Sequence, residues 1–244
     1  MALSAPTIIT TTMTTDGPDR LLYLLQVANA SFPTGAFNHS YGFETWIDAG
    51  ALDDAAGFER ACRDWLRYAA VRTDGAAVAH AYRHAGAGDL DALIALDETV
   101  AALKLSREAR EASFKTGRAL LGAYRDIFSG DSLAPFAAAT RDGRCEGHQS
   151  VIFGAAAAAQ GIDLEDAVLA FLHAALSNLV SVGARLIPLG QIESQRIVKN
   201  AWPLIRTGAD LACTMELDAL GSATAGLDVA SMRHERLHTR LCMS

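Results

Sequence analysis

Residues 163–190 read DLEDAVLAFLHAALSNLVSVGARLIPLG and form the most regular helical pattern in the chain. Asp163 can cap the N-terminus of a helix, and acidic residues just after it place negative charge where the helix dipole favours it. Pro188 and Gly190 then end the pattern. Between these ends, apolar residues recur at helical spacing and form one stripe, namely Val168, Leu172, Ala175, Leu179 and Leu186. Other apolar residues widen this stripe, so we expect the helix to lie at the centre of the fold, buried on most sides.

The same helical spacing recurs through most of the chain. It is present in residues 58–70 and 93–103, and a further amphipathic helix is predicted over residues 113–129. Alternation of apolar and polar residues with a period of two, which would indicate strands, is almost absent. Alanine is abundant in several segments, and small side chains let helix axes approach closely. The sequence therefore predicts an all-α fold, a single-domain multi-helix bundle.

Composition divides the chain into three parts. Residues 1–20 are rich in Thr and contain little that could pack, so they are predicted to form a flexible N-terminal arm. Residues 21–220 carry the helical patterns and are predicted to form one all-α domain. A segment of Gly, Ser, Ala and Thr at 221–226 separates this domain from a polar end of the chain. Residues 221–244 are therefore predicted to be a C-terminal tail that binds a partner.

The charge of the chain argues against two classes of partner. It has 21 Lys and Arg against 28 Asp and Glu, a formal net charge of -7 and a pI near 5.4. Phosphate backbones and anionic membranes do not attract such a surface, and a DNA-binding regulator would need a basic recognition helix. Apolar stretches are too short or too interrupted to span a bilayer, and no signal peptide is apparent. We expect a cytoplasmic protein with neither nucleic acid nor membrane as a partner.

A polar and aromatic cluster, SFPTGAFNHSYGFE at residues 31–44, follows a short apolar run. Pro33 and Gly35 can be explained as an ordinary junction between a helix and a loop. The aromatic residues in and next to the cluster are harder to explain in that way, namely Phe32, Phe37, Tyr41, Phe43 and Trp46. A loop that exposes several aromatic side chains has the composition of a protein interface. We therefore expect a docking surface here.

Candidate catalytic groups lack the neighbours that catalysis needs. His39 and His148 could each act as a general base, but no Ser, Cys or Asp stands at a recognisable spacing to form a nucleophilic pair. Phosphate-binding loops of the GxxxxGK[ST] and GxGxxG types do not occur in the sequence. One alternative stays open, an all-α enzyme in which His39, Glu44 and His148 act as acid-base groups around an apolar pocket. It requires these three side chains to converge.

His234, His238 and Cys242 follow one another at intervals of four residues. A helical tail would place all three on one face, and two His one turn apart can bind zinc or nickel. Neighbouring Arg residues disfavour a bound cation, so we favour a solvated or partner-facing tail and assign no metal ligand. The four Cys residues are scattered without CxxC pairing, which indicates neither a zinc site nor a disulfide framework.

Three separated blocks of the chain resemble the UreF family of urease accessory proteins. The first joins Leu24-Leu25-Gln26 to residues 32–44, and the second runs from Gly147-His148 to Gln195. The third is the end of the chain, residues 232–244. The order and spacing of these blocks match from about Leu21 onward, so the resemblance covers nearly the whole chain.

The resemblance implies an all-α homodimer with no catalytic activity and no cofactor of its own. Proteins of this family bridge UreD, called UreH in some organisms, to the GTPase UreG in the complex that loads nickel into apo-urease, UreABC. By similarity, the tail orders on UreD/UreH, and the dimer surface with residues 32–46 and Arg185 receives UreG. In a sharper variant the protein regulates the GTPase activity of UreG, with Arg185 supplying positive charge to the partner's site.

The partner-binding residues that this resemblance implies are Phe32, Pro33, Gly35, Phe37, His39, Tyr41, Glu44, Trp46, Arg185, Gln191, Met232, Arg233, His234, Glu235, Arg240 and Leu241. This chain departs from the family pattern at His238 and Cys242, where the family commonly has other residues. A metal-binding role for the tail is therefore not carried over.

Overall fold

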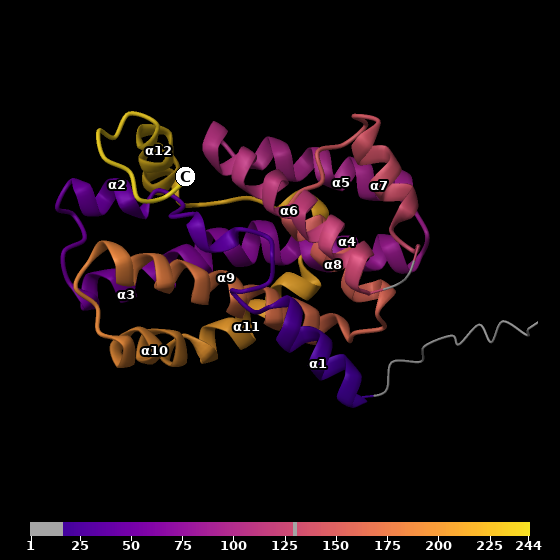
Figure 1. Cartoon of the computed structure of the whole chain (residues 1–244), viewed down its shortest axis with the longest axis horizontal. Helices are drawn as coiled ribbons and strands as arrows, with labels where there is room; N and C mark the ends of the chain where they lie inside the picture. Colours follow the sequence, from indigo (N-terminus) through magenta and orange to yellow (C-terminus); the bar gives the residue numbers. More distant parts are fainter. Residues whose placement is uncertain (1–16, 129–130) are drawn as a thin grey trace, which may run out of the picture.

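A computed structural model describes residues 17–128 and 131–244 of the chain (Figure 1). Within these ranges the ordered elements are all helical, which confirms the predicted all-α fold. They are α1 (Gly17–Val27), η1 (Ala36–Asn38), α2 (Phe43–Asp48), α3 (Ala55–Trp65), η2 (Leu66–Gly75), α4 (Ala76–Gly86), α5 (Leu90–Leu103), α6 (Arg107–Ile127), α7 (Ala134–Arg141), α8 (Gln149–Ala159), α9 (Leu164–Leu186), α10 (Gln191–Asn200), α11 (Trp202–Thr214), η3 (Leu217–Ala219) and α12 (Ala225–His234).

Helix α9 is the predicted central helix, and its first and last residues agree with the sequence pattern. Asp163 occupies the position before its first turn, although its side chain makes no capping hydrogen bond; it pairs instead with Arg20 of α1 at 3.5 Å. Gly183 lets the ring of Phe58 approach α9, since a Cβ there would lie 2.1 Å from Phe58 Cζ. By length and composition α9 could also cross a membrane, but half of its most apolar part is buried inside the protein, as in a core helix.

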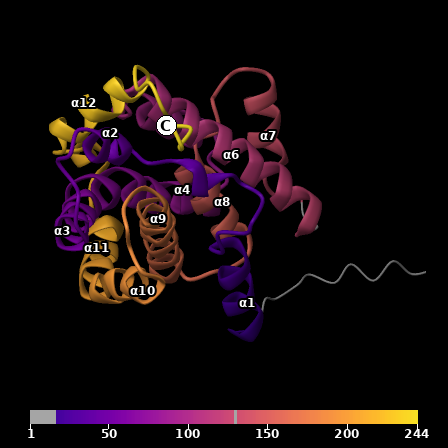
Figure 2. The ribbon, with the colours of Figure 1, turned by 60° about the vertical axis from the view of Figure 1, so that its left-hand side comes forward.

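Small residues bring α4 and α8 into close contact at the centre of the bundle (Figure 2). A Cβ on Gly154 of α8 would lie only 2.3 Å from the carbonyl oxygen of Val78 in α4. Seven alanines of the two helices are buried, namely Ala76, Ala77, Ala79, Ala81, Ala155, Ala156 and Ala157. The close helix approach expected from the alanine content is therefore confirmed.

The two ends of the chain differ from what composition suggested. Residues 1–16 of the predicted arm lie outside the described residues, but residues 17–20 already belong to α1. At the other end, α12 packs against α2 and α6, and the residues after it return to the loop before α2 (Figure 1). Helix α6 also begins at Arg107, earlier than its apolar pattern suggested, because Ser106 caps it through a hydrogen bond from the amide of Ala109. The loop before α2 and the residues after α12 thus lie side by side.

Candidate functional site

The site begins at Gly42, directly before α2. Gly42 has a φ of +90°, a backbone conformation that favours glycine. A Cβ there would lie 2.8 Å from both the carbonyl oxygen of Leu227 and the amide nitrogen of Ser231. The hydroxyl of Thr45 also donates to the carbonyl oxygen of Ala230 at 2.9 Å. Helix α12 therefore rests directly on the start of α2, and only glycine leaves room for its backbone.

His234, the last residue of α12, is completely buried between two carboxylates. Its Nε2 lies 2.8 Å from Glu44 Oε2, and its Nδ1 lies 2.7 Å from Glu108 Oε2. Glu44 comes from the first turn of α2 and Glu108 from the first turn of α6. The histidine thus connects three helices that are far apart in the sequence.

The segment after α12 supplies further donors to the same two carboxylates. The amides of Leu241 and Cys242 donate to Glu44 at 2.6 and 3.0 Å, and Arg240 Nη1 donates to Glu108 Oε1 at 2.8 Å. Burial alone would raise the pKa of the Glu44 carboxyl, but the hydrogen bonds from His234 and from these two amides lower it below its ordinary value. Glu44 is therefore an ionised carboxylate that holds the end of the chain in place.

The last two residues are hydrogen-bonded to the loop that contains the 31–44 cluster. The amide of Met243 donates to the carbonyl oxygen of Asn38 at 2.8 Å, and the amide of Ser40 donates to the carbonyl oxygen of Ser244 at 2.6 Å. His39 Nδ1 lies 2.8 Å from Ser244 Oγ. Burial, with a smaller effect of the Lys115 ammonium, lowers the pKa of His39 to about 4, so this histidine is neutral. The cluster and the tail are therefore partners of each other.

The aromatic residues of the cluster are mostly not exposed, which corrects the expectation of an aromatic loop open to solvent. Phe32 and Phe43 are buried in the core, where Phe43 packs edge-on against Phe58 of α3. Tyr41 stacks on Trp65 with ring centroids 5.4 Å apart, and Trp46 is half-buried. Phe37 is the exception at 42% exposed. Most of these rings serve packing between α2, α3 and the loop.

Arg185, near the end of α9, joins the same region. Its Nη2 donates to the carbonyl oxygen of Phe37 in η1, and its side chain is otherwise open to solvent. Pro33 is exposed, and Gly35 adopts a positive φ of +75° before η1. Gln191 is exposed at the first position of α10. The structure therefore brings Arg185 together with η1, as the resemblance implied.

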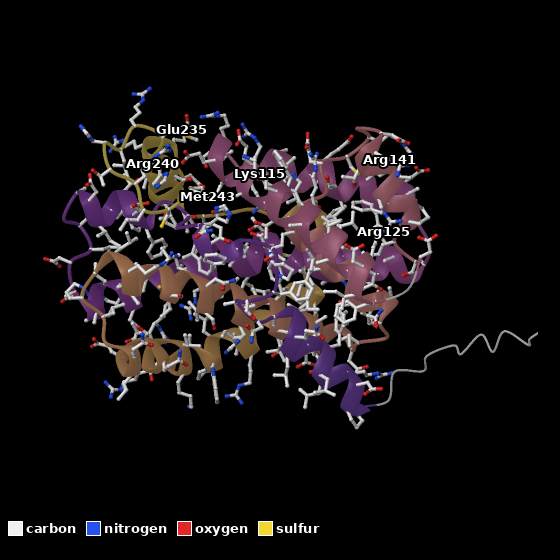
Figure 3. The ribbon with its side chains drawn as sticks, viewed as in Figure 1. Lys115, Arg125, Arg141, Glu235, Arg240 and Met243 are labelled. Carbon is white, nitrogen blue, oxygen red and sulfur yellow. The ribbon has the colours of Figure 1, made fainter. Side chains whose placement is uncertain are left out.

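The tail presents a second set of side chains to solvent. Met232, Arg233 and Leu241 are exposed. Glu235 is bound by Arg107 of α6, whose Nη2 lies 2.9 Å from Glu235 Oε2. Figure 3 shows Glu235, Arg240 and Met243 on the same side of the molecule as Lys115, away from Arg125 and Arg141. The outward face of the docked tail is thus basic and carries apolar side chains.

Two hypotheses that used histidines are not supported by these positions. α12 ends at His234, so His238 and Cys242 lie beyond the helix and do not share its face. Across residues 17–128 and 131–244, no group of three or more His, Cys, Asp or Glu side chains is placed to hold a metal ion. For the enzyme alternative, His39 bonds Ser244 and Glu44 bonds the tail, whereas the ring of His148 packs on Phe114. Among the described residues, no hydrogen bond joins any two of these three side chains.

Glu108 is the charged member of the buried network that the sequence did not single out. It reads as an ordinary acidic residue in the first turn of a helix. One signal could have found it, since Glu108, Ala112 and Thr116 follow one another at intervals of four and all lie on the buried face of α6. A carboxylate on an apolar stripe needs a partner with positive charge.

Comparison with known proteins identifies the family of this chain. The family model described as UreF matches residues 52–201. A urease accessory protein UreF from Geobacillus kaustophilus is 36% identical over 225 residues, which cover 92% of this chain and 98% of that protein. Its counterpart from Actinobacillus pleuropneumoniae is 34% identical over 221 residues, covering 91% and 97%. The one from Rhodopseudomonas palustris is 37% identical over 228 residues and covers 92% of each chain. This chain therefore belongs to the UreF family of urease accessory proteins.

Proposed function

We propose that this protein is a non-catalytic adaptor that bridges UreD/UreH and the GTPase UreG during nickel insertion into apo-urease. The observation that carries the proposal is the docked tail, which forms a basic face on a chain whose formal net charge is -7. This face carries three exposed arginines, Arg233, Arg236 and Arg240. The apolar side chains of Leu241 and Met243 are exposed in the same segment. Such a face fits an acidic protein surface with apolar pockets.

We assign this tail surface to UreD/UreH. The double variant Arg233→Glu with Arg236→Glu reverses two exposed charges and should strongly reduce capture of tagged UreD. The tail should stay docked in this variant, because neither side chain takes part in the buried network. The matched control is Arg125→Glu with Arg141→Glu, which changes the same amount of charge at a distant site (Figure 3). Equal capture by both double variants would contradict the assignment.

We assign the surface around η1 and Arg185 to UreG. Docking alone predicts that Arg185→Ala weakens capture of UreG, since the side chain also holds the carbonyl of Phe37. The regulatory version predicts in addition that GTP turnover by UreG falls at saturating adaptor concentration. Turnover equal to that with the wild-type protein would remove the regulatory version and leave docking.

A third surface suits a second copy of this chain. Helix α1 exposes Leu21, Leu22 and Leu25 at 59%, 61% and 60%, beside a groove of about 910 Å³ between α1, α9 and α11. Trp202 lines the same groove. Helix α1 and helix α12 lie at opposite edges of the ribbon (Figure 2). Apolar patches of this kind mark protein interfaces. In sedimentation experiments, Leu21→Asp with Leu25→Asp should yield monomers, whereas Leu217→Asp, an exposed leucine outside the groove, should not.

A further inference from the structure

The two nitrogens of His234 create a proton-counting problem. Each lies within 2.8 Å of a carboxylate oxygen, on Glu44 at one side and Glu108 at the other. A neutral imidazole has one N–H and one lone pair, so it could donate to only one of them. Its second nitrogen would then place a lone pair against a carboxylate oxygen. Either the ring carries two protons, or one of the glutamates is protonated.

The surroundings of the glutamates decide between these two states. Glu44 accepts the amides of Leu241 and Cys242 besides the ring of His234, so its oxygens are already satisfied as acceptors. Glu108 accepts the guanidinium of Arg240 on its second oxygen. A carboxylate that accepts several N–H donors is stabilised in its ionised form. Both protons therefore belong on the ring.

The charges around the histidine then balance. Two buried carboxylates face one buried imidazolium and the partly exposed guanidinium of Arg240, so this group of four has no net charge. Arg107 and Glu235 pair with each other at its outer side, and Arg185 approaches Cys242 from α9. Burial, with a smaller effect of Glu44, raises the pKa of the Cys242 thiol to about 12, so it stays neutral. Ser106 and Ser231, which bond each other between α6 and α12, are also uncharged.

We propose that His234 is held as an imidazolium in the folded protein and that this charge positions residues 235–244 as the partner-binding face. The assignment of that face to UreD/UreH rests on the function proposed above. Docking of the tail is then linked to protons. An exposed histidine is neutral above about pH 6.5, so at alkaline pH the tail takes up one proton when it docks. Above that pH, docking weakens as the pH rises.

The protonation state is tested directly by nitrogen NMR on the full-length chain labelled at histidine. At pH 8 the His234 ring should show two protonated nitrogens. The amides of Leu241 and Cys242 should be protected from hydrogen exchange under the same conditions. A neutral His234 ring while both amides stay protected would overturn the proposal.

Variants test whether the charge itself positions the tail. His234→Gln leaves two carboxylates facing only Arg240, so exchange protection at Leu241 and Cys242 should fall by roughly tenfold or more. His234→Gln combined with Glu108→Gln removes one positive and one negative charge and should restore part of that protection. His238→Gln, a histidine lost from the same tail, should leave it unchanged. A double variant no better protected than His234→Gln would overturn the role of charge.

Capture of UreD by the same variants separates this proposal from the function on which it rests. If capture of UreD falls and recovers together with the exchange protection, the charged His234 network also controls the partner-binding surface. A second outcome is that the His234 ring is an imidazolium and the tail loosens in His234→Gln, while capture of UreD is unchanged. The assignment of the tail to UreD/UreH then fails, but the role of the imidazolium in positioning the tail is retained.

Discussion

Two completely buried histidines in this protein are held in opposite ways. His234 has a carboxylate on each ring nitrogen, whereas His148, just before α8, has no hydrogen-bond partner for either nitrogen among the described residues. An acid is nevertheless next to His148, since Asp97 of α5 accepts its backbone amide at 2.7 Å. Asp97 uses its other oxygen to accept the amides of Glu146 and Gly147 at 2.8 and 2.9 Å.

The difference teaches that the direction of a carboxylate, and not its proximity alone, sets the charge of a buried histidine. Around His148, burial dominates and lowers its pKa to about 4, with Asp97 only partly opposing it. Its ring is therefore neutral and packs on Phe114. His234 is equally buried, but its acids point at the ring. The ionic region, around His234, is thus held by charged groups. The neutral region, around His148 and Asp97, is held by backbone hydrogen bonds and packing.

The largest effect on the free energy of unfolding is expected at Asp97, the one acid that holds the loop before His148. Asp97→Ala leaves three backbone amides without their acceptor, and we expect the free energy of unfolding to fall by about 3 kcal/mol or more. Asp91→Ala is the control on the same helix, because Asp91 is exposed and only pairs with Arg144 at 3.3 Å. Urea denaturation of both variants measures the difference. A small loss in both would mean that Asp97 does not organise the loop before His148.

The second prediction concerns the glycine under that loop. A Cβ on Gly117 of α6 would lie 2.1 Å from the carbonyl oxygen of Gly147, so Gly117→Ala should destabilise by roughly 1–3 kcal/mol. Gly122 lies in the same helix, and a Cβ added there would have nothing within 4 Å. Gly122→Ala should therefore stabilise by up to about 1 kcal/mol. Thermal unfolding that shifts both variants in the same direction would refute this packing account.

Acid should destabilise the protein through its two neutral buried histidines, His148 beside Asp97 and His39 beside Ser244. The folded protein does not protonate His148 or His39 until about pH 4, whereas the unfolded chain takes up these protons below about pH 6.5. The unfolded state then binds more protons, so stability falls as the pH falls through this window. Each histidine contributes about 2 kcal/mol of loss at pH 5. In urea denaturation at pH 7 and pH 5, His148→Gln should lose less stability than the wild type, while His238→Gln should match it.

The smallest effect on overall stability is expected where α12 packs against α2 in the ionic region. Gly42→Ala and Gly35→Ala both place alanine at a positive φ, which costs each roughly 1–2 kcal/mol. Only at Gly42 does the new Cβ meet the backbone of α12. Hydrogen exchange should therefore accelerate in α12 for Gly42→Ala alone, even if both variants unfold at similar urea concentrations. Unchanged exchange in α12 would show that this contact does not seat the helix.

The sequence was enough to predict α9, because apolar residues at helical spacing and Pro188 are local signals. It was not enough to predict the ionic network. Glu44 is separated from Leu241 and Cys242 by 197 and 198 residues, and no periodic pattern connects them. The prediction that the aromatic side chains of the 31–44 cluster are exposed was wrong for a related reason. α2 spans only Phe43–Asp48, too short for a stripe that would show which face of it is buried.

The order in which the network's members are synthesised adds a consequence for the cell. Glu44 and Glu108 leave the ribosome early, whereas His234, Arg240 and the amides of Leu241 and Cys242 come from the last part of the chain. In a nascent chain, Glu44 and Glu108 therefore have neither His234 nor Arg240 as partners, whereas in the finished protein the four groups have no net charge. Domains can fold during synthesis, but this face cannot form until α12 and the residues after it have been made. The basic face that we propose for UreD/UreH therefore cannot form before residues 225–244 have been made.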